Sequence, residues 1–138
     1  MALPNGAGGY QLGDGNLSEL TLGYNAVPLS QAGTATLSAA QVTAGILIVG
    51  SGATAAQTYT LPATSTIETA VSSAKVGSTF DLNVINIGTS SGTAALAMGS
   101  GTGFTDGGNA AVVTAITASA LFRFRKTADL AWTVYKVA

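Results

Sequence analysis

Six carboxylates are the side chains of this 138-residue sequence with the clearest capacity for acid–base chemistry. Two Asp or Glu residues held at a fixed separation are enough for glycoside hydrolysis, because one donates a proton while the other attacks or activates water. The six are scattered, and most occupy positions typical of turns or helix caps: Asp14, Glu19, Glu68, Asp81, Asp106 and Asp129. Their spacing does not indicate a catalytic pair.

Other common routes to catalysis need residue types that the chain lacks. It has no His and no Cys, so a nucleophile activated by an imidazole base is excluded. Zinc sites built from the usual Cys and His ligands are excluded for the same reason. We therefore predict that the chain is not an enzyme and that it needs no cofactor or metal.

Two loop sequences match ligand sites only in part. DGNLSE (14–19) has oxygen-bearing residues at the spacing of a calcium loop, but Glu19 stands where that loop requires Gly, and Asn25 where it requires Glu. GSGTG (99–103) has the glycines of a phosphate-binding loop, but neither a helix-forming segment nor a Lys-Ser/Thr pair follows it. We interpret both as ordinary loops.

The composition favours a subunit of an assembly. Charged residues make up 8% of the chain, compared with about 25% in an ordinary soluble domain. Ala, Thr, Ser and Gly account for just over half of the residues, and such small side chains each bury little apolar area. A weakly charged, thinly cored chain is expected to cover much of its surface with copies of itself or with a larger structure.

Nucleic acids and membranes are not expected partners. The cations Arg123, Arg125, Lys126 and Lys136 form a local cluster in a chain of net charge −1, whereas binding to phosphates needs many neutralising contacts. The longest apolar run, GILIVG, is far shorter than the roughly 20 residues of a transmembrane helix. The first residues lack the pattern of a secretory signal, so we expect synthesis in a cytoplasm without export.

Residues 1–33 are predicted to form an extended N-terminal arm. The sequence PNGAGGYQLGDGN is Gly-rich and aperiodic, so it is not expected to form a core. In the following ELTLGYNAV, Leu20, Leu22 and Tyr24 alternate on one face, and such a segment can add to the sheet of another subunit. We predict interface contacts at Leu17, Leu20, Leu22 and Tyr24. A frayed terminus is the alternative reading.

Residues 34–138 are predicted to form one all-β domain. The expected strands are 34–37, 46–49, 57–62, 79–87, 93–98, 110–117, 119–126 and 130–137, with a hairpin turn at 127–130. The apolar run ILIV (46–49) is interpreted as a buried strand. Short strands separated by turn signals at this spacing indicate an antiparallel β-sandwich or barrel, jelly-roll-like in layout.

Helical patterns are sparse in this domain. One short helix is expected over 65–76, where Ser65 and Glu68 have the spacing of a capping box and Gly77 provides a stop. Ser38 is expected to cap a single turn that ends at Gly45.

The order of these segments resembles small virion surface proteins of tailed bacteriophages, including capsid decoration (cement) proteins and related fibre or knob modules. The resemblance rests on ATLSAAQVTAGILIV, on TYTLPATSTIETAVSSAKVGSTFDLNVINIG, and on ALFRFRKT followed by AWTVYKV. Within it, a strand ending in Leu-Pro precedes a short Ala/Ser/Thr-rich helix, and a Val-Gly-Ser-x-Phe step matches Val76, Gly77, Ser78 and Phe80. It covers about two-thirds of the chain, and its motifs are structural.

This resemblance implies a homo-oligomer, commonly a trimer, on the outside of a phage capsid. The expected partner is the major capsid protein, and the expected function is to stabilise contacts between capsomers. A tail fibre, spike or knob module that binds a host surface receptor is the alternative. For that alternative, Trp132 and Tyr135 are candidates for stacking on sugar, although packing in the core is the favoured role for both.

Overall fold

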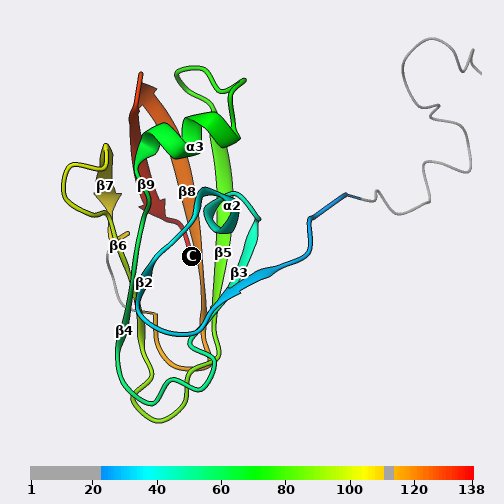
Figure 1. Cartoon of the computed structure of the whole chain (residues 1–138), viewed down its shortest axis with the longest axis vertical. Helices are drawn as coiled ribbons and strands as arrows, with labels where there is room; N and C mark the ends of the chain where they lie inside the picture. Colours follow the sequence, from blue (N-terminus) through cyan, green and yellow to red (C-terminus); the bar gives the residue numbers. More distant parts are fainter. Residues whose placement is uncertain (1–22, 111–113) are drawn as a thin grey trace, which may run out of the picture.

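The computed structural model describes residues 23–110 and 114–138, and these form nine strands and two helices (Figure 1). The sheet-rich fold predicted from the sequence is confirmed. The elements follow in this order: β1 (Leu29–Gln31), β2 (Ala35–Thr36), α2 (Ala39–Val42), β3 (Ile46–Val49), β4 (Gln57–Thr60), α3 (Thr64–Ala70), β5 (Thr79–Asn86), β6 (Ala94–Ala97), β7 (Phe104–Gly108), β8 (Ser119–Ala128) and β9 (Ala131–Lys136).

The strands form two sheets. The larger has six strands in the order β1-β3-β5-β8-β9-β7, and the smaller has three in the order β2-β4-β6. β1 is an edge strand of the larger sheet, although residues 29–31 lie within the range 1–33 predicted for the arm. Within the described residues, the extended segment that precedes the first strand is therefore 23–28.

The predicted antiparallel arrangement is wrong for most strand pairs. From β1 to β6 the chain alternates between the sheets, so that β1, β3 and β5 are parallel in one and β2, β4 and β6 are parallel in the other. Only β5–β8 and β8–β9 are antiparallel among the described pairs, and β7 runs parallel to β9. An alternating pattern identifies a strand but not its neighbour. Parallel neighbours need a crossover connection, and here passage through the other sheet provides it.

The buried apolar side chains form one core cluster. Its aromatic part is a cluster in which the ring of Phe80 stacks on that of Phe124 with centroids 4.7 Å apart, while Phe104 meets Phe124 edge-on at 5.9 Å. Such pairs add about 0.5–1.5 kcal/mol beyond the area that they bury. Both sheets and both helices contribute buried side chains to the core, among them Val42, Leu47, Tyr59, Ile67, Leu82, Leu96, Phe122, Phe124, Trp132 and Val134.

One of the two helices is capped as predicted and the other is not. Ser38 caps α2 as expected, and its hydroxyl and the Gln41 side chain form a reciprocal capping box. The box predicted at Ser65 and Glu68 does not form, because α3 begins after Ala63 without a side-chain cap and the Glu68 carboxylate contacts the β8–β9 hairpin instead. α3 also ends at Ala70 rather than at residue 76.

β7 lies in a segment that was predicted to be a loop. The sequence FTDGG has weak strand propensity because of its two glycines, yet it pairs with β9 and carries a bulge between Asp106 and Gly108. The strand predicted over 110–117 is replaced, in the part that the structure describes, by a single bridge between Ala94 and Thr114.

Candidate interaction surface

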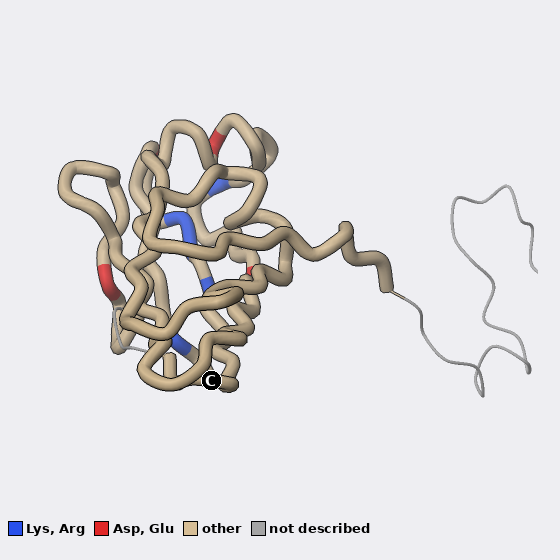
Figure 2. The backbone as a smooth tube through the Cα atoms, turned by 60° about the horizontal axis from the view of Figure 1, so that its bottom comes forward, with Lys and Arg blue, Asp and Glu red and all other residues tan. Residues whose placement is uncertain are grey.

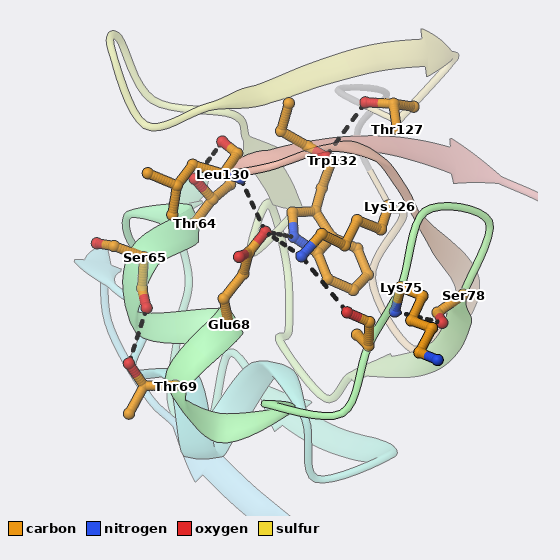
Figure 3. Close-up of polar contacts among 12 residues, drawn as sticks. Thr64, Ser65, Glu68, Thr69, Lys75, Ser78, Lys126, Thr127, Leu130 and Trp132 are labelled. Carbon is orange, nitrogen blue, oxygen red and sulfur yellow. Dashed lines mark hydrogen bonds and ion pairs between the residues drawn. The ribbon is translucent and has the colours of Figure 1, made fainter.

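Glu68 joins helix α3 to the β8–β9 hairpin (Figure 3). Its Oε1 accepts hydrogen bonds from the Leu130 backbone N–H at 2.9 Å and from Trp132 Nε1 at 3.2 Å. The same oxygen lies 2.9 Å from Lys126 Nζ, and both charged side chains are largely buried. The hydrogen bond from Lys126 lowers the pKa of the Glu68 carboxyl, against the opposing effect of burial. This carboxylate is therefore a structural tie between two elements.

Asp81 and Arg123 form a bidentate ion pair across β5 and β8. Arg123 Nε and Nη2 donate to the two Asp81 carboxylate oxygens, each at 2.8 Å. The pair is exposed to solvent, with 49% of the Arg123 side chain and 38% of the Asp81 side chain accessible. The hydrogen bond from Arg123 lowers the pKa of Asp81, so the carboxylate stays ionised and occupied by its own neighbour.

The other predicted acids do not complete a site. Asp106 Oδ1 accepts from the backbone N–H groups of Gly108 and Ala110 at 2.9 and 3.0 Å, as a turn residue does. Asp129 is exposed at the β8–β9 turn, and Asp14 and Glu19 lie outside the described residues. Among residues 23–110 and 114–138, no three His, Cys, Asp or Glu side chains gather as a metal site.

GSGTG (99–103) is a turn with three glycines at positive φ, followed by β7 and not by a helix.

No helix in the described part of the chain has the length and apolar character needed to cross a bilayer.

The segment before β1 is extended and exposed. All six residues 23–28 are accessible, and the side chains of Tyr24 and Val27 are 96% and 81% exposed. Figure 1 shows this segment, in blue, leaving the domain beside β3 and running away from it. Tyr24 is thus placed where a partner can reach it. The other predicted contact residues, Leu17, Leu20 and Leu22, lie outside the described residues.

The larger sheet has an outer face that carries apolar side chains. Leu47 and Val49 of β3 point into the core, so the alternating Ile46 and Ile48 point to the opposite face, where both are only half-buried. Ile85 and Leu121 follow the same rule on β5 and β8. We call Ile46, Ile48, Ile85 and Leu121 the apolar patch. The sequence interpretation of ILIV as a buried strand therefore holds for Leu47 and Val49 but not for Ile46 and Ile48.

The strand register places these four residues together. Ile48 is opposite Ile85 on the neighbouring strand. Asn83 lies between Ile46 and Leu121, as the partner of the first across β3–β5 and of the second across β5–β8. The patch is thus a block of three adjacent strands. Its sequence signal was the unbroken apolar run of β3. Alternation along β5 and β8 did not indicate that the outer faces of these strands also carry apolar side chains.

Polar residues border the apolar patch on one side. Next to the patch on the outer face, Asp81, Arg123 and Tyr135 are cross-strand neighbours on β5, β8 and β9. Arg125 lies two residues further along β8 on the same face. Figure 2 shows how few charged residues the described part of the chain has, as short blue and red stretches on an otherwise tan tube. An apolar centre with a sparse polar rim has the composition of a protein–protein interface.

A small cleft lies between the end of α3 and the start of β5. Its volume is about 260 Å³, below the roughly 300–1,000 Å³ typical of ligand pockets. Its lining has an aromatic ring and hydroxyl groups but no charged side chain: Val71, Ser73, Ala74, Ser78, Thr79, Phe80 and Trp132. Trp132 is 1% exposed, so it packs in the core, as the sequence favoured, and does not offer a free face to a sugar.

Comparison of the chain with protein-family models, with curated proteins and with solved structures gave no match.

Proposed function

We propose that this chain is a structural virion protein that binds the outside of a tailed-phage capsid and stabilises contacts between capsomers. The observation that supports this most directly is the exposed segment 23–28, whose apolar side chains Tyr24 and Val27 are left uncovered by the domain. In the proposal the two sheets form a sandwich, the protein is a homotrimer, and the major capsid protein is its partner.

The proposed mechanism is additive. Each bound copy buries apolar surface across a seam between capsomers, at about 25 cal/mol per Å² of apolar area. Because the protein binds the assembled shell and not its separated parts, binding shifts the equilibrium toward the assembled shell. The low charge of the chain suits this role, since few ionic groups must be desolvated when the surface is covered.

Deletion of residues 1–24 tests the proposal. The described core begins at Leu37, so the shortened protein should fold with an unchanged circular dichroism spectrum. It should no longer sediment with capsids assembled from the major capsid protein. Deletion of residues 1–13 alone is the matched control and should retain binding, because Leu17, Leu20, Leu22 and Tyr24 remain. Normal capsid occupancy by the 1–24 deletion would refute the proposed role of these four residues.

A receptor-binding module of a tail fibre, spike or knob is a second candidate, and the cleft beside Phe80 favours it. An aromatic ring flanked by uncharged hydroxyl groups is suited to a neutral sugar. Trp132 is the sole tryptophan of the chain and lines this cleft, so its fluorescence should report saccharide binding. A stained gel of purified virions separates the two functions, since a decoration protein is far more abundant than a fibre module.

A further inference from the structure

The apolar patch carries a sequence signature of burial that the isolated chain does not satisfy. A strand with one solvated face normally alternates apolar and polar residues, and unbroken apolar runs are typical of strands covered on both faces. β3 is such a run, yet only Leu47 and Val49 are in the core, while Ile46 and Ile48 are half-exposed. The sequence of β3 therefore fits a state in which another chain covers the outer face.

The position of residues 23–28 indicates where the covering segment comes from. They precede β1, which pairs with β3, so they leave the domain next to the strand that holds half of the apolar patch. All six are exposed, and the Asn25 side chain lies next to Gly45, the residue before β3, while the segment as a whole leads away from the domain (Figure 1). A segment directed outward from this edge is placed to reach a neighbouring copy more readily than its own outer face.

The sequence of the covering segment complements the patch. In ELTLGY (19–24), apolar residues alternate over three positions, Leu20, Leu22 and Tyr24, and this spans about 13 Å if extended. Three adjacent strands of the patch span roughly 10 Å across the sheet, so the two lengths match. Residues 1–28 contain two acids and no Lys or Arg, whereas the rim of the outer face carries Arg125 in addition to the self-neutralised Asp81–Arg123 pair.

We infer that residues 17–24 of one copy of this chain dock on the apolar patch of a second copy. The occupant is thus this chain's own N-terminal segment, contributed by a neighbour. The contact is heterologous, because a segment of one copy meets a sheet face of the next, and repeated contacts of this kind close into a ring when the rotation between copies permits. The inference deepens the proposed function by naming the partner of residues 17–24, and it rests on the role proposed there for these residues as an interface.

The test uses full-length chains in solution without any capsid, so it is independent of the capsid-binding result. One variant, Ile48→Thr with Ile85→Thr, alters the patch and keeps β-branched side chains in the strands. A second variant, Leu20→Ser with Leu22→Ser, alters the segment and leaves the described fold untouched. Val76→Thr is the matched control, because Val76 is 64% exposed in a turn away from the patch.

Sedimentation equilibrium should show oligomers for the wild type and for Val76→Thr. Each double variant on its own should associate with itself more weakly than the wild type. The expected loss is at least roughly ten-fold in the dissociation constant for each substituted residue, and ten-fold corresponds to about 1.4 kcal/mol. An equimolar mixture of the two double variants should form heterodimers, because one carries an intact segment and the other an intact patch. Circular dichroism should show that both variants are folded.

Three outcomes would overturn the inference. A monomeric wild type at micromolar concentration would mean that the patch is covered by another protein, such as a capsid protein. Wild-type oligomerisation by the variant with Leu20→Ser and Leu22→Ser would mean that the patch pairs with itself. A mixture that remains monomeric would mean that segment and patch do not meet.

Discussion

At the scale of single residues, two carboxylates in the described part of the protein hold elements together. Glu68 accepts three bonds from the β8–β9 hairpin and Asp81 is engaged by both nitrogens of Arg123 that face it. A carboxylate committed in this way has little capacity to transfer protons to a ligand, because its pKa is held low by cationic partners. Glu68 and Asp81 thus contribute to the fold.

The Glu68 tie predicts a defined pH dependence of stability. The pKa of Glu68 in the folded protein lies below its ordinary value of 4.5, so the ionised carboxylate stabilises the fold above that value. The contribution is lost as the pH falls through the folded-state pKa. Glu68→Gln should therefore lower the melting temperature at pH 7, where Lys126 would lose its ionic partner, and the difference from the wild type should shrink toward pH 2.

Asp129→Asn is the matched control for this prediction. Asp129 is an exposed acid on the same hairpin, and its replacement should change the melting temperature little across the same pH range. A Glu68→Gln melting temperature that equals the wild-type value at pH 7 would show that the buried pair does not stabilise the fold.

At the scale of elements, the β8–β9 hairpin turns through a strained residue. Leu130 has φ = +53° and its side chain is 48% exposed. The left-handed conformation costs a non-glycine residue roughly 1–2 kcal/mol, and Asn adopts it more readily than Leu. Leu130→Asn should therefore raise the free energy of unfolding by about 0.5–1 kcal/mol in urea titrations, because its backbone bonds to Glu68 and Thr64 are retained.

Ala131→Asn, one residue later in β9, is the comparison for the hairpin variant. It introduces the same side chain at a position where no positive φ is found, and it should destabilise because Asn is a poor strand former. Equal destabilisation by both substitutions would contradict the assignment of strain to Leu130.

The sequence predicted elements better than it predicted how they associate. Local patterns were sufficient for β3, β5, β8 and β9, for the second half of the turn predicted at 127–130 and for the Ser38 cap, since each depends on side chains within a few residues. Residues 127 and 128 continue β8, so the turn itself is limited to 129–130. Strand direction was wrong because the crossovers from β1 to β5 depend on which sheet each strand joins. The Ser65–Glu68 cap was wrong because Lys126 and Trp132, distant in sequence, compete for the same carboxylate.

The candidate surface was only partly accessible to sequence reasoning for the same reason. The alternation that includes Tyr24 lies within one short segment, so the sequence could single this residue out as a predicted interface contact. The apolar patch combines residues from β3, β5 and β8, and it is defined only by the register between them. Ile85 and Leu121 gave no separate signal, because each belongs to a strand whose other face is in the core.

At the scale of the whole molecule, the protein presents two complementary apolar surfaces and very few charges. One is the outward-directed segment that includes Tyr24, and the other is the apolar patch of the larger sheet. With charged residues at 8% of the chain, association is expected to depend on burial of apolar area more than on ion pairs.

Salt dependence distinguishes these two sources of affinity. Raising NaCl from roughly 0.05 to 1 M shortens the screening length to about 3 Å, yet it should change the dissociation constant of the wild-type oligomer less than about three-fold, because apolar burial is not screened. Sodium sulfate should tighten association, since it strengthens effective burial. Arg125→Glu places a negative charge near the acidic residues of the N-terminal segment, so this variant should associate more weakly than the wild type at low salt. Its affinity should approach that of the wild type as NaCl rises. Wild-type oligomers that dissociate steeply with NaCl would instead indicate an interface held by charges, contrary to the role argued for the apolar patch.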